Sequence, residues 1–210
     1  MKLTVHTFLT LDGVMQGPGG PDEDTTGGFT RGGWVVPLVD EGFGRIVDGW
    51  FAQADEILLG RTTYDMMSEF WSQVTDPEDE VGRRLNALPK HIASTTLTDP
   101  TWNNSTVIEG DVVEAVRALK ERPGRELQVH GSWELLQALQ AAGLVDEYRL
   151  LVFPVVLGTG KRLFGEGTAP TGFTLVDSEV TGTGAVYEVL RPAPLGTGDI
   201  VVEDGREVIV

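Results

Sequence analysis

Residues 57–63 read Ile-Leu-Leu-Gly-Arg-Thr-Thr, and residues 127–132 read Leu-Gln-Val-His-Gly-Ser. Each stretch is a short apolar run that ends at a glycine and leads into a helical pattern through a hydroxyl residue. Such a run predicts a buried strand, and a glycine before Ser or Thr is typical of a turn into a helix. Two strand–turn–helix units in one chain predict an α/β domain with a mostly parallel sheet.

Strand and helix patterns alternate around these two units as far as residue 157. The expected strands are 3–11, 56–59, 90–95, 105–108, 127–129 and 147–157, and the expected helices are 43–54, 62–71, 112–119 and 132–142. Beyond residue 157 only strand patterns follow, at 173–180 and 185–191, joined by a Gly-rich turn. These last strands predict an antiparallel edge on the sheet.

We interpret residues 1–191 as one domain and residues 192–210 as a C-terminal extension. In the extension, the Asp-Gly pair at 204–205 separates two apolar runs, which predicts a β-hairpin. Exposed apolar strands seldom stay unpaired, so we expect the hairpin to pair with the edge of the domain or with another subunit.

The charge and composition exclude several classes of protein. The 210 residues include 16 Lys and Arg against 32 Asp and Glu, a net charge of −16, which argues against non-specific binding to nucleic acids or anionic membranes. The absence of cysteine excludes disulfides and cysteine-ligated zinc, and the three widely spaced histidines predict no metal site. The first residues form no apolar block, and the longest apolar run, 150–157, is too short to span a bilayer, so we expect a cytoplasmic protein.

Glycine is over-represented, with 27 residues, and seven of them lie between residues 16 and 34. This segment lacks periodicity and predicts a long functional loop, such as a lid. Trp34 at its end could stack on a planar ring or could anchor the loop. Asp12 is an early carboxylate available for acid–base chemistry, although with Gly13 it could simply close the first strand.

The turns after the strands offer phosphate-binding groups. Free N–H groups at the helix start, the hydroxyls of Thr62 and Thr63 and the guanidinium of Arg61 could hold a phosphate, but a tight turn with a solvated Arg explains the same residues. A second turn of this kind, at 130–132, makes the pair suitable for a dinucleotide pyrophosphate at a switch point of the sheet. His130 in that turn could be a base or an ordinary polar strand end.

Two other stretches are weaker candidates. Ser94 and Thr95 could hold the extra phosphate of NADP, although hydroxyl residues are common where a strand leaves a sheet. Residues 157–162, Leu-Gly-Thr-Gly-Lys-Arg, lack the spacing of the nucleotide-binding phosphate loop, which excludes an NTPase of that kind.

Several of these stretches recur together in one known family. In order along the chain they are 10–13, 59–64, 90–97, 129–132, 143–147 and 154–160. From residue 2 to residue 191 the sequence resembles the dihydrofolate-reductase-like family, typified by the C-terminal reductase domain of the bifunctional riboflavin-biosynthesis deaminase/reductase. The resemblance implies a three-layer α/β fold, a homodimer and binding of NADPH.

By position in these motifs, the resemblance implies a set of cofactor contacts. The phosphates would meet Gly60, Arg61, Thr62 and Thr63, the adenosine 2′-phosphate would lie near Ser94 and Thr95, and the pyrophosphate near Gly131 and Ser132. The loops around Asp12 and up to Trp34 would border the nicotinamide and the substrate, which makes these two residues the catalytic candidates. Because the chain is acidic, we also expect local cations at the cofactor, with Arg61, Lys90, Lys161 and Arg162 as candidates.

Two positions depart from the riboflavin enzymes, which carry an acidic residue followed by two glycines where this chain has His130, Gly131 and Ser132. The function implied is an NADPH-dependent reductase of a small pteridine- or pyrimidine-like heteroaromatic substrate. The alternative is a non-catalytic NADPH-binding protein, a sensor or scaffold on the same fold.

Overall fold

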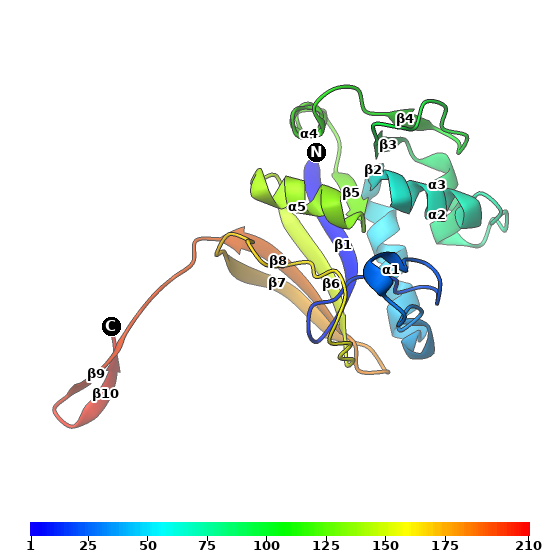
Figure 1. Ribbon diagram of the computed structural model, residues 1–210. Coiled ribbons are helices and arrows are strands. Elements are labelled where there is room, and N and C mark those ends of the chain that lie inside the picture. Colours follow the sequence, from blue (N-terminus) through cyan, green and yellow to red (C-terminus); the bar gives the residue numbers. More distant parts are fainter.

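The computed structural model describes residues 1–210, and its largest element is an eight-stranded sheet (Figure 1). The strands are β1 (Lys2–Thr10), β2 (Ala54–Gly60), β3 (Lys90–Ala93), β4 (Ser105–Val107), β5 (Glu126–His130), β6 (Glu147–Phe153), β7 (Gly172–Val180) and β8 (Val186–Ala193). They lie in the order β4-β3-β2-β5-β1-β6-β8-β7. Pairing is parallel from β4 to β6 and antiparallel at β8 and β7, which confirms the predicted fold class.

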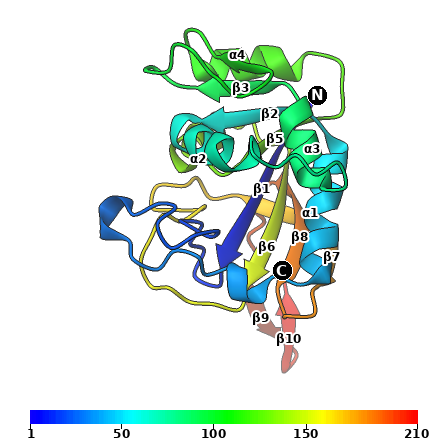
Figure 2. The ribbon, with the colours of Figure 1, turned by 90° about the vertical axis from the view of Figure 1, so that its right-hand side faces the viewer.

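Five helices cover the two faces of this sheet (Figures 1 and 2). They are α1 (Glu41–Gln53), α2 (Arg61–Trp71), α3 (Glu80–Ala87), α4 (Val112–Lys120) and α5 (Trp133–Ala141). On β2, Leu58 packs into the same core as α4 and α5, whereas its neighbours Ile57 and Leu59 pack with α1, α2 and α3. Side chains alternate between the faces of a strand, so α1–α3 lie on one face and α4–α5 on the other. No helix is both long and apolar enough to cross a membrane.

Side-chain caps explain where several helices begin. The carboxylate of Asp111 accepts a hydrogen bond from the Glu114 N–H at 3.0 Å, as the sequence pattern predicts for the start of α4. Asp79 caps α3 in the same way through the Gly82 N–H at 2.7 Å. This short helix is absent from the elements that the sequence patterns predict.

The predicted strand 147–157 is shorter in the structure, where β6 ends at Phe153. Residue 154 is a proline, which has no N–H to donate to a neighbouring strand, so the ladder stops there.

The C-terminal segment forms a hairpin of β9 (Ile200–Glu203) and β10 (Arg206–Ile209), which pair only with each other. Figure 1 shows this hairpin well away from the main sheet. Of the two expected partners, the edge of its own domain is excluded, because the edge strands β4 and β7 pair only with β3 and β8. Pairing with another subunit stays a prediction. Apolar side chains of the hairpin, such as Ile200 and Val202, are exposed.

Candidate functional site

A cleft of about 1520 Å³ opens where β2 and β5 end. These strands are parallel neighbours, yet the helices that follow them, α2 and α5, lie on opposite faces of the sheet. Two adjacent chains that leave in opposite directions create a crevice at the carboxyl ends of the strands, where α/β proteins bind their ligands. The two turns that the sequence singles out therefore meet at such a switch point.

The two turns are in direct contact. The Gly60 N–H donates a hydrogen bond of 2.6 Å to the hydroxyl of Ser132, 72 residues further along the chain. Gly131 has a φ of +78°, and a Cβ placed there would lie 3.7 Å from the Thr63 hydroxyl oxygen. Glycine adopts this left-handed backbone without the steric cost that other residues have.

Ser132 directly precedes α5, a position where a serine hydroxyl commonly caps the helix, but it does not do so here. It precedes α5 with a φ of +63°, and its side chain makes no capping hydrogen bond. Left-handed backbone is costly for a residue with a side chain, which is consistent with a glycine at this position in the riboflavin enzymes. Here the hydroxyl satisfies the Gly60 N–H instead, so the serine joins the two turns.

All eight residues predicted to hold the cofactor line this one cleft. They are Gly60, Arg61, Thr62, Thr63, Ser94, Thr95, Gly131 and Ser132. Arg61 already has protein partners, because its Nε lies 2.7 and 2.9 Å from the two carboxylate oxygens of Asp65 and one terminal nitrogen lies 3.4 Å from the Thr96 hydroxyl. Its side chain is still 40% exposed and accessible to a ligand.

Trp34, one of the two catalytic candidates, does not line the cleft. Its indole is 9% exposed, donates a hydrogen bond of 2.9 Å to the Gln16 carbonyl and packs edge-on against Phe153. Of the two alternatives that the sequence leaves open, the structure corresponds to an anchor for the loop rather than a stacking platform for a ligand.

Asp12, the other candidate, also lies outside the cleft lining. Its carboxylate accepts hydrogen bonds from the Thr10 hydroxyl at 2.6 Å and from the N–H groups of Leu157 and Gly158 at 3.2 and 2.8 Å. The bond from Thr10 is the largest of the effects that lower the pKa of Asp12 to about 2. The group is therefore ionised at neutral pH and joins the end of β1 to the loop after β6, as the alternative interpretation holds.

The Gly-rich loop forms one wall of the cleft. Figure 2 shows this loop beside the carboxyl end of β1. Gln16 fixes its shape, because the side-chain amide donates to the Thr26 carbonyl at 3.0 Å and its oxygen accepts from the Lys161 N–H at 3.0 Å. The Lys161 ammonium pairs with Asp24 at 2.7 Å. Although burial acts to raise it, the hydrogen bond from Lys161 helps to lower the pKa of Asp24 below its ordinary value.

Of the four cations expected near the cofactor, only Arg61 and Lys161 line the main cleft. Lys90 is fully buried, and its ammonium donates to the carbonyls of Leu85 and Leu88, so the expectation for this residue is wrong. Arg162 does not line the main cleft. Its Nε donates a hydrogen bond of 2.8 Å to the backbone carbonyl of Asp12.

The cleft has an aromatic floor, formed by His6, Trp50, Phe51 and His130, that the sequence patterns do not predict. The His130 ring stacks on Phe51 at 4.6 Å and on His6 at 4.9 Å, and Trp50 meets the His6 ring edge-on at 5.0 Å. Burial lowers the pKa of His130 to about 3. Burial, followed by the charges of His130 and Arg149, lowers the pKa of His6 well below its ordinary value. The alternation of side chains along β1 places His6 on the face opposite Val5, and this pattern could have identified His6 as a candidate site residue.

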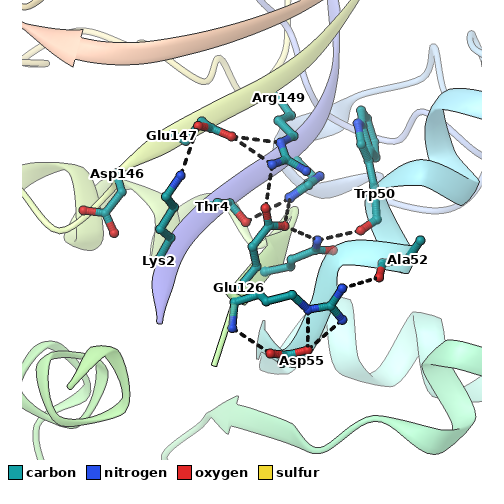
Figure 3. A network of polar contacts seen from close by, with 12 residues as sticks. Lys2, Thr4, Trp50, Ala52, Asp55, Glu126, Asp146, Glu147 and Arg149 are labelled. Atoms are coloured by element: carbon teal, nitrogen blue, oxygen red, sulfur yellow. Dashed lines mark hydrogen bonds and ion pairs between the residues drawn. The ribbon is translucent and has the colours of Figure 1, made fainter. Parts of the chain in front are cut away.

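A polar network lies beneath this floor (Figure 3). The Gln128 side-chain amide donates to the Trp50 carbonyl and to the Glu126 carboxylate, both at 2.7 Å. The same carboxylate accepts from Arg149 at 2.5 Å, and Arg149 also binds Glu147. These bonds fix the orientation of the buried Gln128 and Glu126 side chains. Gln128 in turn contacts His130 of the floor.

The fold and the cleft together define an α/β protein with a large cleft at the switch point of a mostly parallel sheet. Residues 1–187 match the model of the RibD C-terminal domain family, and the chain belongs to that family. The resemblance inferred from the sequence is thereby confirmed.

Individual proteins agree with this assignment. The uncharacterized protein YyaP of Bacillus subtilis is 29% identical over 190 residues, which are 90% of this chain and 93% of that relative. A pyrimidine reductase-like protein from Corynebacterium diphtheriae has a TM-score of 0.60 and 12% identity over 91% of this chain and 92% of its own. The Thermotoga maritima diaminohydroxyphosphoribosylaminopyrimidine deaminase/5-amino-6-(5-phosphoribosylamino)uracil reductase has a TM-score of 0.60 and 16% identity over 91% of this chain and 56% of its own. At these identities the two structures establish the fold alone.

Proposed function

We propose that this protein is an NADPH-dependent reductase of a small heteroaromatic, pteridine- or pyrimidine-like compound. The observation that carries the proposal is the meeting of two strand–helix turns, through Gly60 and Ser132, at one large cleft. Membership of the RibD C-terminal domain family supports a reductase. Two structural neighbours, a pyrimidine reductase-like protein and a 5-amino-6-(5-phosphoribosylamino)uracil reductase, support the substrate class.

The residues at the turns fit a dinucleotide. The first N–H groups of α2 and α5 have no partner inside their helices, and two helix starts are suited to a pyrophosphate. The left-handed Gly131 has no side chain to obstruct it, and Arg61 can add a charge-assisted bond to a phosphate. Ser94 and Thr95 would meet the adenosine 2′-phosphate. When bound, NADPH would supply the hydride.

The chain itself supplies orientation and exclusion of water. The stacked rings of His6, Phe51 and His130 line the floor of the cleft and give it an aromatic surface. The Gly-rich loop, held to Lys161 through Gln16 and Asp24, closes one side. Removal of water strengthens the polar interactions that orient the reacting groups.

Quenching of tryptophan emission by NADPH tests cofactor binding, because Trp50 and Trp133 line the cleft. We expect Arg61→Ala to bind NADPH at least about tenfold more weakly, from the loss of one charge-assisted phosphate contact of about 1.5 kcal/mol. Arg83→Ala is the matched control, because Arg83 forms a comparable exposed ion pair on α3 with Glu80. Equal NADPH affinity in both variants would show that no cofactor phosphate contacts Arg61.

Turnover separates a reductase from a binding protein. NADPH oxidation is measured against a panel of carbonyl, imine and pterin compounds. Oxidation with one of them supports the reductase, binding without turnover across the panel favours a sensor or scaffold, and absence of binding to NADPH and NADH contradicts both.

The homodimer and the cytoplasmic location inferred from the sequence remain predictions. Exposed apolar side chains on the edge strand β7, Leu175, Val176 and Val180, are consistent with a subunit contact there. Light scattering that gives the mass of one chain would contradict the dimer.

A further inference from the structure

The two histidines of the cleft floor carry an unused hydrogen-bonding capacity. His6 is 1% exposed and lines the cleft, and its Nδ1 has no hydrogen-bond partner. A buried nitrogen without a partner is destabilising and needs an explanation in a native structure. A ligand that supplies the partner is one such explanation.

The polar network beneath the floor determines which nitrogen of His130 carries the proton. Both N–H groups of the Gln128 amide are used, one by the Trp50 carbonyl and one by Glu126. The remaining Gln128 oxygen can only accept, and it lies 3.0 Å from His130 Nε2, which must therefore be the donor. In the neutral ring, Nδ1 then holds a lone pair and is the polar atom that His130 can offer to the cleft.

For His6 the position of the proton follows from a nearby charge, because the Thr4 hydroxyl beside Nε2 can either donate or accept. Its Nε2 lies 3.0 Å from the Thr4 hydroxyl and 4.0 Å from the Glu126 carboxylate, whose negative charge favours a proton on that nitrogen. Its Nδ1 is then an acceptor as well. Since burial keeps both rings neutral at physiological pH, neither ring can act as the acid that transfers a proton to a substrate.

We propose that His6 and His130 form the recognition subsite for the substrate ring and accept N–H hydrogen bonds through Nδ1 from a flat nitrogen heterocycle. This inference rests on the proposed function, since it assigns the cleft floor to the substrate and the two turns to the cofactor. It predicts selection for rings with N–H or amino donors over rings of equal size without them. The carboxamide of NADPH has the same donor chemistry, so the experiment must separate the two sources.

The test uses two pyrimidine probes and the full-length protein. Diaminouracil carries ring and amino N–H groups, whereas dimethyluracil, methylated on both ring nitrogens, has none. In nitrogen NMR of histidine-labelled protein, we expect diaminouracil alone to shift the Nδ1 resonances of His6 and His130, and dimethyluracil to leave them unchanged. A shift caused by NADPH alone, with none from diaminouracil, would assign the pair to the cofactor and overturn the proposal.

A variant gives an independent measurement. His130→Phe keeps a ring to stack on Phe51 and His6 but removes the acceptor, and we expect it to bind diaminouracil at least about fivefold more weakly. Its NADPH affinity should stay within about twofold, which separates this inference from the proposed cofactor site. His91→Gln is the control, because His91 binds Glu56 outside the cleft. Unchanged diaminouracil affinity in a folded His130→Phe protein overturns the inference even if NADPH oxidation is intact.

Discussion

The sequence makes Asp12 a catalytic candidate, whereas in the structure its carboxylate joins the end of β1 to the loop after β6. The variant Asp12→Asn distinguishes a catalytic role from a structural one. The carboxylate accepts three hydrogen bonds and lies 3.4 Å from the Arg162 guanidinium. The hydrogen bond from Thr10, together with those from Gly158 and Leu157, lowers its pKa from 3.8 to about 2, although burial acts to raise it. A shift of that size corresponds to at most about 2.5 kcal/mol of folding free energy, and solvent screening near the surface reduces it to about 1 kcal/mol.

The sign of the pH dependence follows from the direction of the shift. Because the pKa of Asp12 is lower in the folded state, the unfolded chain binds more protons as the pH falls from about 4 toward 2. The stabilisation by Asp12 is therefore complete above about pH 5 and is lost as the pH falls through about 2. Asp12→Asn should be less stable than wild type by about 1 kcal/mol at pH 7, and the difference should shrink in acid.

The assay is urea unfolding between pH 7 and pH 3, with Asp99→Asn as the control. Asp99 is an exposed loop carboxylate, so its substitution should leave the free energy of unfolding unchanged. If Asp12→Asn is as stable as this control and yet abolishes NADPH oxidation, the structural interpretation of Asp12 is refuted and its catalytic role is restored.

Three further predictions concern stability and the loop. Ser132→Ala should lower the free energy of unfolding by about 1–3 kcal/mol because the Gly60 N–H loses its partner, and unchanged stability in urea unfolding would contradict the bridge. Ser132→Gly should cost less because it relieves the left-handed backbone, and a larger loss than in Ser132→Ala would contradict that strain. Lys161→Met should speed amide hydrogen exchange in residues 17–27 by releasing Asp24, and unchanged exchange would mean that Gln16 alone holds the loop. Removal of the hairpin after residue 193 should change the free energy of unfolding by less than about 0.5 kcal/mol, and a larger loss in thermal or urea unfolding would reveal contacts with the main sheet or a partner.

The parts of the fold that follow from local patterns could be predicted from the sequence. The apolar run before Gly60 and its counterpart before Gly131 predict two neighbouring strand–helix turns, and the structure brings them together. The α3 helix was missed because its eight residues carry few apolar positions, and its start depends on the Asp79 cap. Short helices of this kind form mainly through tertiary packing, which a local pattern does not contain.

The side-chain roles in the site depend on contacts between distant segments. The sequence allows Trp34 to anchor or to stack, and only the packing against Phe153 decides between them. The left-handed conformation of Ser132 depends on the Gly60 N–H across the sheet, so an N-cap was the reasonable local prediction. The pairing of His6 with His130 requires the register between β1 and β5, which no single strand reveals.

The charge around the cleft limits how it can hold an anionic cofactor. Five acidic side chains, Asp22, Glu23, Asp24, Asp48 and Glu134, line it against two cations, Arg61 and Lys161. Both cations already pair with carboxylates, so little positive side-chain charge is left for a phosphate. Backbone N–H groups at the starts of α2 and α5 add no net charge and do not depend on salt bridges, and their dipoles favour an anion. Affinity for a dinucleotide in this acidic chain must therefore depend mainly on the two turns, with Arg61 as the one cation placed beside them.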